Sequence, residues 1–151
     1  MPIRPAVLAD LRAVQRCARE AYQIYVPRIG KRPAPMIADF QLCIEQGRLH
    51  VLEPVDEVVG YVVFYPRDDH IHLENVAVLP DQQGMGYGAQ LMVFVEQEAT
   101  RLGFRRIELY TNEKMTENIT YYPYLGYEEI GRWEEDGFNR VFFRKELWSG
   151  S

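Results

Sequence analysis

The sequence is poor in residues that cross-link a chain or anchor it in a membrane. Only two of its 151 residues are cysteines. Cys17 and Cys43 both occupy apolar positions of helical patterns, which predicts reduced core thiols and not a disulfide. The most apolar run, Val58 to Tyr65, is interrupted by Gly60 and is far too short to span a bilayer. No apolar stretch near Met1 has the length of a signal peptide, so we expect a cytoplasmic protein and no membrane partner.

Basic residues are also outnumbered. The chain has 17 Lys and Arg against 22 Asp and Glu, a formal net charge of −5. Because nucleic-acid-binding domains usually carry a basic face, we expect no nucleic-acid partner. An acidic surface is instead compatible with a cationic substrate such as an amine.

The rest of the composition is that of one folded domain. Hydrophobic residues make up 47% of the chain and charged residues 26%, as in soluble globular proteins. The aromatic share of 13% argues against disorder. A chain of this length can bury a sizeable core without cross-links. We therefore expect a single domain over residues 1–151.

Hydrophobic periodicity predicts helices at both ends of an antiparallel meander. Apolar residues three and four apart indicate a first helix, which the segment Val26 to Gly30 breaks, and a short second helix. Runs rich in β-branched and aromatic residues then predict three strands. The predicted ranges are 8–25 and 36–44 for these helices, 48–53, 58–65 and 71–78 for the strands, then a helix over 86–102, a strand over 105–110, a helix over 116–125 and a hairpin within 127–147. This order predicts an α/β or α+β domain with a mixed sheet.

Residues 82–89 read QQGMGYGA, a glycine-rich turn directly before the predicted long helix. Gly84, Gly86 and Ala89 fit the dinucleotide fingerprint, with Glu108 as its acidic residue, but that fingerprint should open a series of parallel βαβ units, and here a meander comes first. A Walker-type loop is excluded because no Gly-Lys-Ser/Thr follows. Two interpretations remain: a plain loop, or backbone N–H groups at a helix N-terminus that bind a pyrophosphate.

Two motifs make the second interpretation specific. The stretch Leu73 to Gly88 resembles the acetyl-CoA site of GNAT-superfamily N-acetyltransferases, whose turn [QR]-x-x-G-x-[GA] follows a V-A-V-x-P strand end and is matched by Gln83, Gly86 and Gly88. Residues 122–127, YPYLGY, are similar to the family signature Y-x-x-L-G-[FY]. The resemblance covers nearly the whole chain. It implies the GNAT fold, a central mixed, mostly antiparallel sheet flanked by about four helices.

The resemblance also implies an acetyl-CoA cosubstrate. The backbone of residues 76–78 would pair with the pantetheine arm, and the amides of residues 84–89 would hold the pyrophosphate. The cofactor contacts expected from the resemblance are Val76, Ala77, Val78, Gln83, Gly84, Met85, Gly86, Tyr87, Gly88, Ala89 and Asn118. Asn118 is included because the asparagine that many members place seven residues before the catalytic tyrosine is Met115 here.

Catalytic roles follow from the same resemblance. Tyr122 occupies the position of the general acid that protonates the departing CoA thiolate, although it is also explained as a packing aromatic. His72 and Glu74 lie at the strand positions that supply a general base, and ordered water is an equal alternative. His70, His72 and Glu74 also suggest a metal site. Their i, i+2, i+4 spacing places side chains roughly 7 Å apart per step, too far to share one ion, so we expect no metal.

The acceptor is defined only by class. The resemblance implies an acetyl transfer to a primary amine of a small molecule or peptide, by direct attack in a ternary complex. Specificity would come from residues 21–32 and 133–138, where Tyr22, Tyr25 and Trp133 form either an aromatic wall or part of the core. An edge strand in the final hairpin makes a homodimer plausible. The alternatives are a non-catalytic CoA-binding or sensing module of the same fold and a Rossmann oxidoreductase.

Overall fold

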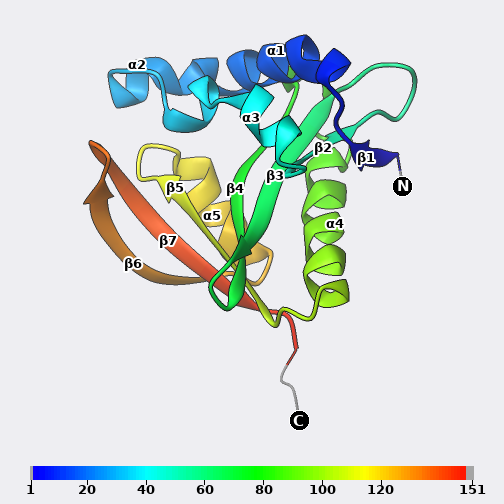
Figure 1. The fold of residues 1–151 in the computed structure, drawn as a ribbon. Coiled ribbons are helices and arrows are strands. Elements are labelled where there is room, and N and C mark those ends of the chain that lie inside the picture. The colour runs from blue at the N-terminus through cyan, green and yellow to red at the C-terminus, as the bar shows by residue number, and fades with distance from the viewer. Residues whose placement is uncertain (1, 149–151) are drawn as a thin grey trace. The chain divides into compact units, whose positions relative to one another are not determined.

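Residues 2–148 are described in a computed structural model of the protein (Figure 1). They divide into two compact units, one formed by residues 2–65 and 73–95 and the other by residues 66–72 and 96–148. Helix α4 (Tyr87–Arg101) and strand β4 (His70–Val78) each contribute residues to both units. The single domain expected from the sequence stays a prediction.

The strands of the first unit confirm the predicted meander and add a strand to it. Their order is β1-β2-β3-β4, and the β1–β2 and β2–β3 ladders are antiparallel. The strands are β1 (Ile3–Pro5), β2 (Leu49–Leu52), β3 (Gly60–Arg67) and β4. The sequence did not predict β1, because three residues are too few to show a period of two.

The helices of the first unit differ from the prediction at two places. They are α1 (Leu11–Tyr22), α2 (Val26–Ile29) and α3 (Phe40–Glu45), with 3-10 turns at Leu8–Asp10, Gln23–Tyr25 and Ala34–Ile37. The first helix ends at Tyr22, three residues before its predicted limit. The segment predicted to break it forms the separate short helix α2, because Pro27 lies in the first turn, where its missing N–H costs nothing, and α2 ends at its C-cap, Gly30. The predicted second helix is interrupted at Asp39, whose carboxylate accepts the Leu42 N–H at 3.0 Å and starts α3.

Both cysteines lie in the interior of the first unit. Cys17 and Cys43 are buried and free, which confirms the prediction of core thiols. Burial raises the pKa of the Cys17 thiol to about 12 and also raises that of Cys43. Both sulfurs therefore stay protonated at neutral pH.

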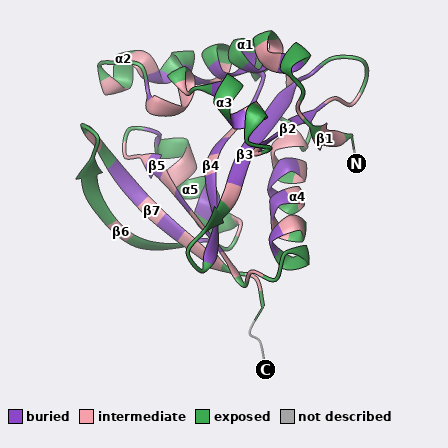
Figure 2. Ribbon diagram, in the orientation of Figure 1, coloured by how far each residue is buried: buried purple, intermediate pink, exposed green. Residues whose placement is uncertain are grey.

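The second unit contains the predicted C-terminal hairpin. Its strands β5 (Arg106–Asn112), β7 (Phe138–Glu146) and β6 (Glu128–Glu135) pair in that order, all antiparallel, and helix α5 (Thr116–Tyr124) precedes β6. Asp136 and Gly137 join β6 to β7 with positive φ at both residues, as a type I′ turn requires. Figure 2 shows β6 exposed along its length.

The two faces of this three-stranded sheet differ in burial. Ile107, Leu109, Val141 and Phe143 alternate along β5 and β7 and are almost fully buried. The residues between them carry aromatic and charged side chains on the opposite face. Within residues 2–148 no helix combines the length and apolar character needed to cross a membrane.

Candidate functional site

The glycine-rich turn between β4 and α4 lies in the first unit. A 3-10 turn at Pro80–Gln82 follows β4, and α4 begins at Tyr87. Gly84 and Gly86 have φ of 85° and 81°, values that residues with a Cβ rarely adopt. A Cβ added at either glycine would meet no heavy atom within 4 Å, so the space above the turn is open.

The backbone of this turn offers donors to an anion. The Gln90 N–H donates to the Gly86 carbonyl at 3.0 Å, so the amides of the first α4 residues before Gln90 have no acceptor within the helix. The Gln83 side chain donates to the Val78 carbonyl at 3.1 Å and fastens the turn to the end of β4. Open space, positive φ and unpaired helix N–H groups fit a bound pyrophosphate.

Glu74 and Val76 lie on β4 before the turn. The Tyr65 hydroxyl donates to the Glu74 carboxylate at 3.0 Å. The Tyr22 hydroxyl lies 2.9 Å from the Val76 carbonyl oxygen. Tyr22 and Tyr25 are both buried, with ring centroids 6.4 Å apart, so these two tyrosines belong to the core of the first unit.

Sequence reasoning missed Asn75, which lies between these two residues. Its Oδ1 accepts from the hydroxyls of Tyr22 at 3.1 Å and Tyr61 at 2.9 Å, and its Nδ2 donates to the Pro35 carbonyl at 3.0 Å. Asn75 and both tyrosines are buried. The signal available in the sequence was a single amide in a strand that also carries two histidines and a glutamate.

His72 lies in the second unit, and its ring centroid is 5.7 Å from that of Tyr110. Burial lowers the pKa of His72 to about 4, with smaller contributions from the positive charges of Arg67, His70 and Arg140. The imidazole is therefore neutral at pH 7. It is also a weak proton acceptor, because its conjugate acid is strongly acidic for a histidine.

Tyr122 lies on α5 in the second unit and is buried among aromatic rings. Its centroid lies 5.9, 5.8 and 5.7 Å from those of Tyr121, Tyr127 and Phe143. These contacts fix the ring, as both the catalytic and the packing interpretation require. The neighbouring Tyr127 hydroxyl is buried without a hydrogen-bond partner among the described residues, and burial raises the pKa of Tyr127.

Asn118 is held within the second unit by its side-chain amide. The amide nitrogen donates to Thr111 Oγ1 at 3.1 Å and lies 3.7 Å from the sulfur of Met115. Met115, which stands at the position of the family asparagine, is buried at the start of α5. A cofactor contact by Asn118 would therefore use its amide oxygen.

Aromatic side chains cover part of the sheet in the second unit, and we call this strip the aromatic face. Its members are His72, Tyr110, Trp133 and Phe142. The Trp133 and Phe142 rings are stacked with centroids 3.7 Å apart and planes 10° apart. A Cβ at Gly131 would overlap the indole, so the glycine allows Trp133 to lie flat. Trp133 nevertheless remains 48% exposed.

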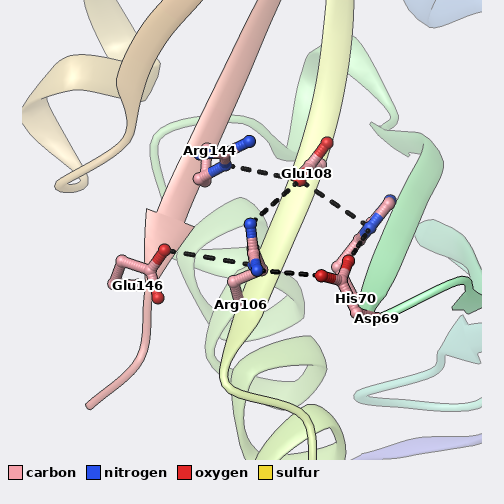
Figure 3. Close-up of polar contacts among 6 residues, drawn as sticks. All are labelled: Asp69, His70, Arg106, Glu108, Arg144 and Glu146. Carbon is pink, nitrogen blue, oxygen red and sulfur yellow. Dashed lines mark hydrogen bonds and ion pairs between the residues drawn. The ribbon is translucent and has the colours of Figure 1, made fainter. Parts of the chain in front are cut away.

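An ion-pair network lies in the second unit (Figure 3). Its residues are Asp69, His70, Arg106, Glu108, Arg144 and Glu146. His70 Nδ1 lies 3.2 Å from Asp69 and 3.7 Å from Glu108, and Arg144 donates to Glu108 at 3.3 Å. His70, a residue of the metal alternative, and Glu108, the acidic residue of the dinucleotide alternative, are therefore paired with each other and with neighbouring side chains. No three His, Cys, Asp or Glu side chains within residues 2–148 are grouped as metal ligands.

The expected site residues thus fall into two groups. The first unit contains Glu74, Val76 to Val78 and the turn over residues 83–89, and the second contains His72, Asn118 and Tyr122. Within the first unit, Glu74 lies on β4, and the glycine-rich turn follows the end of this strand.

Comparison with known proteins gives a consistent result. The chain matches the sequence model described as "Acetyltransferase (GNAT) family" over residues 12–127. It is 33% identical over 95 residues to "Probable N-acetyltransferase 14" of Xenopus tropicalis, covering 61% of this chain and 46% of the relative. It is 31% identical over 80 residues to "Aminoalkylphosphonate N-acetyltransferase" of Salmonella typhimurium, covering 48% and 51%. The chain spans about half the length of the curated relatives it matches.

A solved structure has the same fold. PaiA N-acetyltransferase from Thermoplasma acidophilum, in complex with coenzyme A, matches 95% of this chain and 97% of its own with a TM-score of 0.74 at 13% identity. The mixed α/β architecture expected from the sequence is therefore confirmed, and the seventh strand, β1, is the one that the sequence did not predict.

Proposed function

Because this chain belongs to the acetyltransferase (GNAT) family, we propose that it transfers the acetyl group of acetyl-CoA to a primary amine of a small molecule or peptide. Family membership places the chain among the acyltransferases. In the proposed reaction the amine attacks the thioester directly within a ternary complex, and binding both reactants together lowers the entropic part of the barrier.

The observation that carries this proposal is the geometry of the turn between β4 and α4. Its unpaired amides over residues 84–89 and the N-terminal dipole of α4 would hold the pyrophosphate. The backbone of Val76 to Val78 would pair with the pantetheine arm. An amide near Val76 or Ala77 would polarise the thioester carbonyl. Acetyl-CoA supplies the activated acetyl group, and the turn supplies its binding.

Tyr122 is the proposed general acid. A phenol has a pKa of about 10 in model peptides, so it protonates a leaving thiolate only if it is held close to the sulfur. The packing of its ring against Tyr127 and Phe143 supports a fixed position. Proton delivery would complete the release of CoA.

Glu74 is the preferred residue for removing the amine proton, directly or through water. An ammonium with a pKa of about 10 gives up its proton poorly to a base whose conjugate acid is much stronger. His72, with a pKa of about 4, is such a base, but a carboxylic acid in a model peptide is just as acidic. The preference for Glu74 therefore rests on position, because Glu74 lies in the unit that contains Val76 and the turn and His72 does not. Glu74 is only half-buried, and its carboxylate already accepts one hydrogen bond from Tyr65.

An assay of CoA thiol release with a panel of amines tests the proposal. We expect thiol release that depends on both acetyl-CoA and an amine. Tyr122→Phe should lower kcat about a hundredfold or more while the affinity for acetyl-CoA changes little. Tyr121→Phe removes a hydroxyl from the adjacent, more exposed residue and serves as the matched control. Wild-type turnover in Tyr122→Phe would refute the role of the phenol.

The same assay separates this function from its alternatives. Binding of acetyl-CoA without thiol release for any amine would favour the non-catalytic CoA-binding module, and binding of a nicotinamide dinucleotide instead would favour the oxidoreductase. We further propose a homodimer formed through β6, the exposed edge strand of the second unit. A sedimentation coefficient that stays monomeric at high protein concentration would contradict the dimer.

A further inference from the structure

Arg140 is a buried cation on the aromatic face. It lies on β7, opposite Asn112 on β5 and Trp133 on β6, and is only 5% exposed. Its guanidinium carbon lies 4.1 Å from the centroid of the Tyr110 ring and 5.8 Å from that of Phe138. A guanidinium in this position is oriented by the rings against which it packs.

Only one nitrogen of this guanidinium has acceptors. Nη1 donates to Glu135 at 2.6 Å and lies within 3.4 Å of an Asp136 carboxylate oxygen. The Nε–H and the two Nη2–H donors of Arg140 have no acceptor among the described residues. Neither nitrogen is among the unpartnered side-chain atoms of the described residues that are sealed from water, so a ligand can reach this edge of the guanidinium.

The unoccupied edge has a specific shape. Nε–H and Nη2–H point in parallel and match the two oxygens of a carboxylate or of a phosphonate group. Glu135 and Asp136 balance part of the positive charge and hold the opposite edge through Nη1. The Nε–Nη2 edge of the Arg140 guanidinium, which we call its fork, is thus preorganised to bind a planar or tetrahedral oxyanion and not a cation, because it presents only N–H donors.

We propose that the Nε–Nη2 edge of Arg140 binds an oxyanion of the acceptor, which is therefore an amine that also carries a carboxylate or phosphonate group. The inference rests on the proposed function for the amine half of the substrate. The aromatic face would provide an apolar surface for the carbon chain that separates the amine from the oxyanion.

The charges around His72 support an anionic ligand. Burial is the main reason that the pKa of His72 is lowered, and the positive charges of Arg67, His70 and Arg140 lower it further. The Tyr110 ring contacts both the His72 ring and the Arg140 guanidinium. A short anionic amine would therefore remain next to both residues within the second unit.

Binding without acetyl-CoA tests the oxyanion site separately from catalysis. The probes are 3-aminopropylphosphonate, 4-aminobutyrate and butylamine, which share an amine and differ in the terminal group. Nuclear magnetic resonance of the Trp133 indole N–H and the His72 ring follows the titration. We expect the phosphonate, the carboxylate or both to shift these resonances at concentrations at least tenfold below those that butylamine requires. Equal responses to all three probes would overturn the proposal.

Two arginine variants sharpen the test. Arg140→Lys keeps a positive charge and loses the fork, so the Kd of the anionic probe should rise at least tenfold. Arg132→Lys, at an exposed residue of β6 paired with Glu129, is the matched control and should leave the Kd unchanged. Unchanged binding in Arg140→Lys would refute the assignment. If that variant does not fold, the comparison of the three probes on the wild-type protein still decides.

Steady-state kinetics link the site to the reaction. With the preferred anionic amine, Arg140→Lys should raise KM at least tenfold with little change in kcat, while its KM for butylamine should not change. Anion binding without turnover of any amine would leave the oxyanion site in place and refute the acetyl transfer. Turnover of amines with no preference for a terminal anion would support the acetyl transfer and refute the oxyanion site.

Discussion

At the residue scale, His72 and Glu74 differ more in their surroundings than their alternation on one strand suggested. Sequence spacing makes them equivalent candidates, and histidine has the more convenient ordinary pKa. Burial removes this advantage, because the pKa of His72 falls to about 4. Glu74 keeps partial solvent contact and a single hydrogen bond from Tyr65. The residue type was readable from the sequence, but its burial was not.

The depressed pKa of His72 predicts a stability that falls with acid. The pKa is about 6.5 in an unfolded chain and about 4 in the folded protein. Between these values the unfolded chain binds more protons, so the free energy of unfolding decreases as pH falls, by up to about 3 kcal/mol. The contribution of His72 is complete above pH 6.5 and is lost as pH falls toward 4.

This effect is measured by urea unfolding of the wild type and of His72→Gln. The experiment covers pH 7.5 to 4, roughly the interval spanned by the two pKa values. Carboxylates such as Asp10, whose pKa is lowered by Arg4, contribute equally to both proteins and cancel in the difference. The variant should lose less stability on acidification than the wild type. Parallel curves, or a resonance of His72 that titrates near its ordinary pKa, would contradict the prediction.

At the element scale, the turn between β4 and α4 is where sequence and structure agree best. The motif names Gln83, Gly86 and Gly88, and the structure gives Gly86, and Gly84 just before it, a left-handed backbone below open space. Local signals of this kind are readable because turn geometry depends on the residues of the turn itself. By contrast, Gly131 is unremarkable in the sequence, since its role depends on Trp133 lying across it onto Phe142.

Alanine substitutions in the turn separate backbone strain from binding. Gly84→Ala and Gly86→Ala should each lower stability by about 1 kcal/mol, because a Cβ is unfavourable at positive φ. Gly47→Ala meets the same conditions, with φ of 70° and no atom within 4 Å, and is the control in the same unit. By calorimetry, only the turn variants should lose affinity for acetyl-CoA, by about tenfold. Equal affinity in all three would show that the turn does not bind the cosubstrate.

At the scale of the whole molecule, the order of elements was predictable and several contacts between distant segments were not. The helical period of α1 and α4, the β-branched and aromatic run of β3 and the alternation in β5 are local patterns, and the structure confirms them. Arg140, however, becomes unusual only when Tyr110 and Glu135 are placed around it. Asn75 becomes important only when Tyr22 is brought to it across 53 residues of chain. Both depend on tertiary contacts that no short window contains.

The contacts of Asn75 therefore allow a prediction of how the stability of the first unit changes when this side-chain amide is removed. It joins residues from α1, β3 and the segment before α3 to β4 through three hydrogen bonds. Asn75→Ala would leave the buried Tyr61 hydroxyl and the part-buried Pro35 carbonyl without these partners, while Tyr22 keeps the Val76 carbonyl. Because each unsatisfied buried group costs about 1–3 kcal/mol, we expect a loss of about 2–4 kcal/mol in the free energy of unfolding.

A double-mutant cycle distinguishes this network from simple packing. Tyr61→Phe removes the hydroxyl that donates to Asn75 and keeps the ring that packs 5.3 Å from Phe40. In the Asn75→Ala background the same change should cost less than in the wild type, or even stabilise the protein, because the hydroxyl has already lost its partner. Urea unfolding of the four proteins measures the coupling. Additive effects would mean that Asn75 fills space in the core of the first unit without holding its tyrosines by hydrogen bonds.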